Sequence, residues 1–254
     1  MRWRHSLGLI TVVVAAVGTS GCTSIVGGNA RPAAQVTAGS VIGPAIQQVM
    51  VGDKALSGIF DQPFRLGRLP GPRLGGQEVL RNDAAQWPPD CLGVARMLEH
   101  DVYRSLGIRN VAVETWKPST SRAPVLDVEE GVVSFASPRD AQALFDTFAA
   151  QWRGCDGARQ AFTVGQTQVD AMIANVDVDP SVLAAVVWMH FPGLGLQPDP
   201  VYTVRALGMR GNCLVEVKVD YSHRFTPSRP RPGEMNTSAV TVARAMMYNV
   251  SASP

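Results

Sequence analysis

Hydrophobic and polar residues alternate along much of the second half of the chain, as they do in β-strands that bury one face. Val and aromatic residues are frequent in these stretches, which favours extended structure. Two similar stretches stand earlier in the chain. The sequence therefore predicts seven strands, over residues 110–117, 124–136, 161–164, 168–176, 182–189, 201–209 and 213–221.

Residues 137–154 carry the clearest helical pattern in the chain. Ser137 is the expected N-cap, Pro138 suits the first turn, and Asp140 can complete a capping box. Gly154 ends the pattern. Apolar side chains fall on one face of this helix, so we expect that face to be buried. They are Ala141, Leu144, Phe145, Phe148 and Trp152.

Three other stretches have apolar residues at helical spacing. Asp90 is placed to cap a helix over residues 91–106, and Gly107 is placed to end it. Residues 43–60 predict one or two short helices. Residues 236–249 predict a closing amphipathic helix.

The order of these elements decides the fold class. Strands joined by short turns pair as antiparallel neighbours, and Arg210-Gly211-Asn212 is typical of a hairpin turn because Gly and Asn adopt positive φ. A doubly wound parallel sheet needs a helix between successive strands, and those helices are missing. We therefore expect an α+β fold, an antiparallel sheet packed with helices. The Pro- and Gly-rich residues 62–89 predict a long loop region.

The N-terminus has the pattern of an export signal. Arg2 and Arg4 precede an apolar run that ends at Val17, and small residues lead from there to Cys22. The run is too short to cross a bilayer core, which takes about 20 helical residues. The residues before Cys22 resemble a bacterial lipobox, in which diacylglycerol alkylates the cysteine before cleavage. A plain signal peptide with an incidental cysteine is the alternative.

These features predict how the chain is organised. We expect residues 1–21 to be a signal peptide and residues 22–40 to be a lipidated N-terminus and flexible tether. Residues 41–254 are then one domain on the extracytoplasmic face of the cell membrane. The membrane is the expected partner, through a lipid anchor that is stable because it has at least two acyl chains.

Charge and cysteine content narrow the possible chemistry. The formal net charge of +2 predicts no nucleic-acid partner. If Cys22 is lipidated, three cysteines remain, so at least one has no mate within the chain. Cys91 and Cys155 flank two predicted helices and are the favoured disulfide, while Cys155 with Cys213 is the alternative. The histidines and cysteines lack metal-ligand spacing, so we expect neither a metal nor a cofactor.

No catalytic motif is present, so we expect that the chain is not an enzyme. Acidic residues cluster at Asp127, Glu129 and Glu130 and again at Asp177 and Asp179. Two carboxylates that face each other can perform acid–base chemistry. Beside turns they more simply form polar surface, so an envelope hydrolase is only the lesser alternative, and no catalytic residue is assigned.

Two sequence features suggest a family. Residues 151–157, QWRGCDG, resemble the W-x-x-C-x-G signature of PknH-like extracellular sensor domains, and a cysteine that opens a helix stands some sixty residues earlier. Residues 204–212 are similar to the R-A-x-x-x-R-G-N turn of that family. The resemblance covers roughly residues 40–250. Members of this family are ectodomains of mycobacterial kinases or stand-alone lipoproteins, and this chain is similar to the lipoprotein branch.

The resemblance implies an α+β domain that is stapled by a disulfide and has a cleft between sheet and helices. It also implies an unidentified small-molecule or envelope-component ligand, bound by residues that the sequence does not identify. The alternative is a docking or scaffold protein of the envelope without a small ligand. The family often has a second disulfide, whereas Cys213 has no evident mate here.

Overall fold

The computed structural model describes residues 40–82, 89–103, 107–121, 123–164, 166–192, 201–222 and 234–252. The chain divides into two compact units, Met1–Gln35 and Val36–Pro254, and every described residue belongs to the second. The expected signal peptide, Cys22 and nearly all of the expected tether lie outside the described residues. None of the helices in the described part combines the length and apolar character that crossing a membrane requires.

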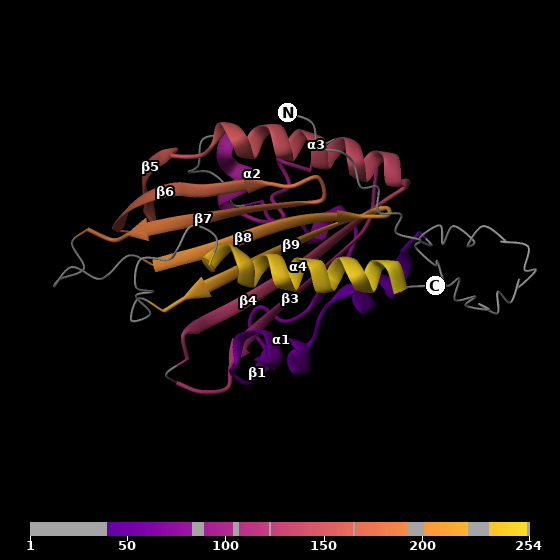
Figure 1. The fold of residues 1–254 in the computed structure, drawn as a ribbon, viewed down its shortest axis with the longest axis horizontal. Helices are drawn as coiled ribbons and strands as arrows, with labels where there is room; N and C mark the ends of the chain where they lie inside the picture. Colours follow the sequence, from indigo (N-terminus) through magenta and orange to yellow (C-terminus); the bar gives the residue numbers. More distant parts are fainter. Residues whose placement is uncertain are drawn as a thin grey trace, which may run out of the picture. The chain divides into compact units, whose positions relative to one another are not determined.

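The fold is built on a nine-stranded sheet in which every pairing is antiparallel. The strand order is β1-β3-β4-β9-β8-β7-β6-β5, and β2 also pairs with β3 (Figure 1). The strands are β1 (Phe64–Leu66), β2 (Arg73–Gly75), β3 (Ile108–Pro118), β4 (Val125–Phe135), β5 (Arg159–Val164), β6 (Thr167–Val178), β7 (Val182–His190), β8 (Val201–Arg210) and β9 (Cys213–Tyr221).

The seven predicted strands are confirmed as β3 to β9, and the α+β fold class is confirmed with them. β1 and β2 were not predicted. Each has three residues and lies in the Pro- and Gly-rich region, so neither has room for an alternating pattern. Tertiary pairing with β3 makes them strands.

The helices are α1 (Asp53–Phe60), α2 (Leu92–Ala95), α3 (Pro138–Gly154) and α4 (Glu234–Ala252). The 3-10 helices η1 (Gly43–Val49), η2 (Gln77–Val79) and η3 (Pro89–Cys91) join them in the described part. The two short helices expected early in the chain are confirmed as η1 and α1, and the closing helix as α4. Gly52, with a φ of 83°, separates η1 from α1.

The helix predicted over residues 91–106 was wrong in length. α2 ends at Ala95, because Arg96 is extended, with φ −133° and ψ 139°, and Leu98 has a φ of 57°. Asp90 is not its cap, since η3 runs directly into the helix through Cys91. After α2 the chain turns inward, and the backbone N–H of Leu98 donates to a buried carboxylate of β9. A tertiary contact therefore replaces the helical hydrogen bonds.

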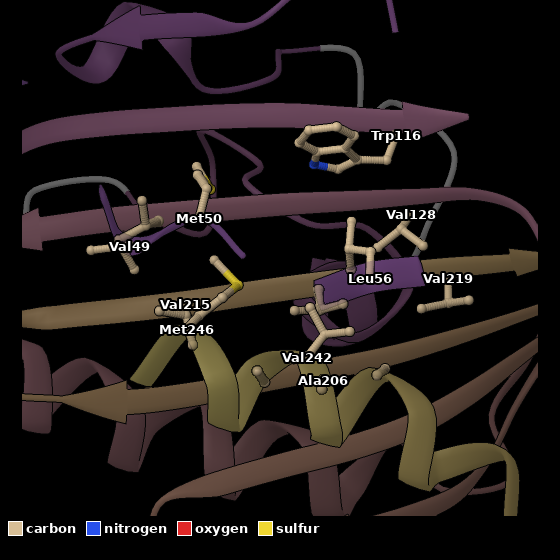
Figure 2. Packing of buried hydrophobic residues seen from close by; sticks show 14 of the residues in the cluster. Val49, Met50, Leu56, Trp116, Val128, Ala206, Val215, Val219, Val242 and Met246 are labelled. Carbon is tan, nitrogen blue, oxygen red and sulfur yellow. The ribbon is translucent and has the colours of Figure 1, made fainter. Parts of the chain in front are cut away.

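Helices cover both faces of the sheet (Figure 1). We call the side with η1, α1 and α4 the α4 face and the side with α2 and α3 the α3 face. Figure 2 shows Val242 and Met246 of α4 gathered with Val215 of β9 and Leu56 of α1 in the cluster on the α4 face. Successive side chains of a strand point to opposite faces of the sheet. Val215 therefore belongs to the hydrophobic cluster on the α4 face, and Leu214 to the cluster on the α3 face.

On the α3 face, α3 buries the apolar residues that its pattern predicted. The Cys91–Cys155 disulfide joins the start of α2 to the end of α3, with Cα atoms 5.7 Å apart, and so confirms the favoured pairing. Cys213 is a buried free thiol on the α4 face, as expected. Burial raises its pKa to about 12, which keeps it protonated and unreactive.

The turn between β8 and β9 corrects one expectation. Gly211 has the positive φ that the hairpin needs, whereas Asn212 does not. The buried Asn212 side chain instead accepts the backbone N–H of Val41 at Oδ1 and donates from Nδ2 to the backbone C=O of Val41. Nδ2 also donates to the backbone C=O of Phe135. Asn212 therefore fixes the start of the domain to the sheet.

Replacing Ser137 with Ala is expected to lower the free energy of unfolding by about 1 kcal/mol. The Ser137 hydroxyl accepts the backbone N–H of Asp140 at 3.2 Å and donates to the Asp140 carboxylate at 2.8 Å. Urea denaturation would measure the loss. An unchanged transition midpoint would show that this cap does not stabilise α3, and Ser137→Asp, which keeps a capping oxygen, is the matched control.

Candidate functional site

On the α3 face, the strands carry polar side chains at the end of the sheet where β3 and β9 finish. Strand register explains the grouping: Glu129 of β4 stands opposite Lys218 of β9, which stands opposite Arg205 of β8. One step along the sheet, Asp220 of β9 lies between Asp127 of β4 and Thr203 of β8. Alternation then places residues two apart on the same face.

The inner part of this group is a buried polar network. Arg205 and Glu216 are fully buried, and Nη2 of Arg205 lies 2.6 Å from Oε2 of Glu216. Oε1 of Glu216 accepts the Tyr103 hydroxyl at 2.6 Å and the Leu98 N–H at 3.0 Å. Nη1 of Arg205 donates to the C=O of Val94 at 3.1 Å. The network therefore attaches α2 and the segment after it to the sheet.

Burial shifts the pKa values of Glu216 and Arg205 in opposite directions. It raises the pKa of Glu216, against the effects of Arg205, Tyr103 and the Leu98 N–H. It lowers the pKa of Arg205, while the nearby Glu216 opposes that change. A guanidinium stays charged in proteins, and both carboxylate oxygens of Glu216 accept hydrogen bonds. The two terminal nitrogens of Arg205 and both oxygens of Glu216 are thus hydrogen-bonded within the protein, while Nε of Arg205 is buried without a partner among the described residues.

The outer part, which we call the polar patch, comprises Lys117, Asp127, Lys218 and Asp220. Nζ of Lys218 lies 2.9 Å from Asp220 and 3.5 Å from Asp127, and Nζ of Lys117 lies 3.1 Å from Asp127. The side chains are 38% exposed at Lys117, 26% at Lys218, 19% at Asp220 and 14% at Asp127. Solvent therefore reaches these charges.

The charges of the polar patch shift one another's pKa values. Burial by itself would lower the pKa of Lys218, but Asp220, Asp127 and Glu129 together raise it, so Lys218 stays protonated. Burial and the neighbouring Asp220 raise the pKa of Asp127, and the two lysines oppose this. Two cations and two anions leave the patch without net charge. It suits a polar ligand that offers both donors and acceptors.

Residues from outside the sheet border the polar patch. Arg81 forms an ion pair with Glu129, which is only 3% exposed. The backbone of Arg81 pairs with that of Glu99 in an isolated β-bridge. Oε1 of Glu99 lies 2.6 Å from Nε of Arg96. The segments before and after η3 thus reach the same region of the sheet. Residues 83–88 lie outside the described residues.

The structure separates the acidic residues that the sequence singled out. Asp127 and Glu129 lie on the α3 face and pair with cations, while Glu130 lies on the α4 face. Asp177 is on β6, and Asp179 pairs with Arg244 of α4 at 3.8 Å. Two lysines, which the sequence reading did not single out, complete the patch. Strand alternation around Lys117 and Lys218 was the signal that could have identified them.

The structure describes two of the histidines in the domain, His100 and His190. Nε2 of His100 lies 3.3 Å from Nε2 of Gln77, and His190 ends β7. His223 lies outside the described residues. Within the described ranges, no group of three or more His, Cys, Asp or Glu side chains is arranged to hold a metal ion.

A second polar feature lies on the opposite face. Glu130 is fully buried, and Glu114 of β3 stands directly across from it. Oε2 of Glu130 accepts the Val51 N–H at 2.8 Å, while Oε1 has no hydrogen-bond partner among the described residues. Asn249 of α4 donates to the backbone of the same segment, at Met50. Glu130 therefore helps to fasten the η1–α1 connection, and it does so without a cation.

Comparison with known proteins bears on the whole domain. The profile of the PknH-like extracellular domain family matches residues 41–249. The crystal structure of the extracellular domain of PknH from Mycobacterium tuberculosis resembles this structure with a TM-score of 0.65. The sequences are 16% identical, and the match covers 84% of this chain and 98% of that one. No curated protein matches the chain.

Proposed function

This chain belongs to the PknH-like extracellular domain family, and we propose that it is a lipid-anchored envelope protein that binds a small ligand at the polar patch. Its role is recognition rather than catalysis. The partial exposure of Lys117, Lys218 and Asp220, beside the fully buried Arg205–Glu216 ion pair, is the observation that carries the proposal.

The sequence supports the anchor. Cys22 follows a short apolar run and small residues, and residues 23–40 are rich in small residues and lack an apolar pattern. The domain that follows belongs to an extracellular family. Intact-mass analysis of the membrane-extracted protein tests the anchor, and an unmodified Cys22 or a retained Met1 contradicts it.

The polar patch supports ligand binding because its charges have been partly removed from water. Such groups bind a complementary ligand more strongly than fully hydrated ones, since less water must be displaced. The ligand chemistry follows from the donors and acceptors. Ammonium groups donate and carboxylates accept, which suits a hydroxyl-rich or zwitterionic molecule. Asp127 and Asp220 stand opposite each other, but each forms an ion pair with a lysine, so the patch offers charged donors and acceptors, and binding rather than hydrolysis is proposed.

Native mass spectrometry of residues 23–254, purified from a mycobacterial host, should show a mass excess that disappears on denaturation. Lys117→Gln and Lys218→Gln should each reduce the bound fraction by roughly tenfold or more, because each removes a charged hydrogen-bond donor. The exposed Lys54 of α1 offers the matched control, Lys54→Gln, which should keep the excess. Circular dichroism confirms that each variant is folded.

The outcomes separate the candidate functions. A mass excess that survives both patch substitutions places the ligand elsewhere and contradicts the proposed site. No excess in any folded variant contradicts ligand binding and favours the alternative, a docking or scaffold protein. Turnover of the released molecule would favour the envelope hydrolase.

A further inference from the structure

One edge of the sheet carries an unusual excursion. β1 and β2 both pair with β3, which leaves residues 67–72 between them. Leu66 stands opposite Trp116, and Arg73 stands opposite Val113. Gly67 still donates to Thr115 of β3, so residues 68–72 leave the edge, and the chain returns to it at Arg73, opposite Val113. The excursion has to project away from the sheet.

The projecting segment exposes large apolar side chains. Leu69 is 90% exposed, while Leu66 and Leu74 are 39% and 41% exposed. These are three of only six large hydrophobic residues exposed in the described part of the chain. A single exposed leucine needs no explanation, but this concentration at a tip and its two flanks does.

Arginines alternate with these leucines. Arg65 and Arg68 are exposed, and Arg73 lies beside them with Nη1 donating to the C=O of Val79. No acidic residue occurs between Asp61 and Glu78. The segment itself therefore carries only positive charge, although the Glu78 carboxylate lies at its end, where it accepts the Gly76 N–H. We call residues 64–75 the Arg-Leu edge.

The edge is held firmly to the domain. The Gly67 N–H donates to the C=O of Thr115 at 2.7 Å, and a Cβ at Gly67 would lie only 2.8 Å from that oxygen. Phe64 is buried, and its ring meets the ring of Phe60 at 5.6 Å. The exposed leucines therefore sit on a fixed support, which lowers the entropic cost of docking.

The chemistry of the edge favours a lipid surface over a protein strand. Pro70, Pro72 and the three-residue lengths of β1 and β2 work against the addition of a further strand. Arginine binds phosphate well, and a cation near an anionic membrane is attracted to it. Exposed leucines at a tip can enter the boundary between headgroups and acyl chains.

We propose that the Arg-Leu edge docks the domain onto an anionic lipid bilayer. The proposal rests on the proposed lipid anchor only for keeping the domain near the membrane. The eighteen residues 23–40 could span at most about 60 Å, enough for this edge to reach the surface. Docking would fix which way the polar patch faces, so the anchor would position the domain as well as retain it.

The test holds the protein on vesicles without using Cys22. Residues 23–254, which contain every described residue, carry an N-terminal hexahistidine bound to a nickel-chelating lipid. An environment-sensitive fluorophore is placed on Leu69→Cys or, as control, on Tyr248→Cys, which replaces a 73% exposed residue of α4. On phosphatidylglycerol vesicles, emission at position 69 should shift to the blue and be quenched by spin-labelled lipids, while position 248 should be unaffected.

Charge and lipid variants complete the test. Arg65→Gln with Arg68→Gln should reduce the ratio of docked to undocked molecules by roughly 25-fold, because each arginine near an anionic surface contributes about fivefold. Phosphatidylcholine vesicles or high salt should have the same effect. Equal signals at positions 69 and 248 would overturn the proposal. In the absence of vesicles, the emission at position 69 could shift to the blue as the protein concentration rises. That result would show that the Arg-Leu edge binds a second copy of the chain instead of a bilayer. Neither result depends on Cys22, which intact mass tests separately.

Discussion

Replacing Arg205 with Ala is expected to lower the free energy of unfolding by about 3–5 kcal/mol, because it leaves Glu216 buried without its cation. Arg205 is fully buried, and its guanidinium bonds both Glu216 and the C=O of Val94. The substitution removes both contacts at once. It should also loosen the segment around Leu98, whose N–H binds the same carboxylate. Chemical denaturation measures the stability, and hydrogen exchange at Leu98 measures the local effect.

A double substitution separates the charge from the packing. Arg205→Met with Glu216→Gln removes both charges and keeps an amide oxygen that can accept the Leu98 N–H, so it should recover much of the lost stability. Tyr103→Phe removes one hydrogen bond to Glu216 and should cost only about 1 kcal/mol. If Arg205→Ala were no more destabilising than Tyr103→Phe, the ion pair would not be what holds α2 to the sheet.

Stability is expected to fall as the pH rises from about 4.5 to about 8, and Glu130→Gln should remove much of that fall. Burial raises the pKa of Glu130 from 4.5 to about 8. The hydrogen bond from the Val51 N–H lowers this pKa, and the neighbouring charge of Glu114 raises it further. The folded state therefore binds a proton that the unfolded state has already released. A shift of this size corresponds to an effect on the order of 5 kcal/mol.

The sign follows from the raised pKa. Below pH 4.5 both states hold the proton, so the contribution of Glu130 to stability is fully present. Between 4.5 and about 8 only the folded state holds it, and stability declines with each unit of pH. Above about 8 both states are ionised and the decline from this group ends. Burial also raises the pKa values of Glu216, Asp127 and Glu114, so these groups add a background slope of the same sign.

Urea denaturation at a series of pH values measures this slope. Glu130→Gln should be more stable than the wild type at pH 8 and should show a flatter profile, since the amide cannot ionise. Glu114→Gln is the comparison variant: burial raises the pKa of Glu114, and its charge raises that of Glu130, so it should also flatten the profile, but less than Glu130→Gln because Glu114 is only half-buried. Parallel profiles for the wild type and Glu130→Gln would contradict the prediction.

The periodic elements of this fold could be predicted from the sequence. The pattern of α3, its Ser137 cap and the alternation in β3 to β9 are local properties of neighbouring residues. The Cys91–Cys155 disulfide followed from the positions of two cysteines beside predicted helices. The short strands β1 and β2 and the turn after α2 did not follow, because pairing with β3 and bonds to Glu216 stabilise them.

The polar patch shows the same division. Sequence reasoning found Asp127 and Glu129 but grouped them with Glu130, which alternation sends to the other face. It also gave no weight to Lys218, which lies about ninety residues from Asp127 and meets it only because β9 pairs with β4.

By itself the sequence determined the fold class and the family resemblance, and it predicted the export signal. Each of these depends on residues close together in the chain. Only the tertiary structure decided which charges are buried, which are partly exposed, and which leucines project from an edge. Those properties depend on the pairing of strands that are distant in sequence, such as β4 with β9, and no turn joins these strands to specify that they pair. The polar patch and the Arg-Leu edge are both products of that pairing.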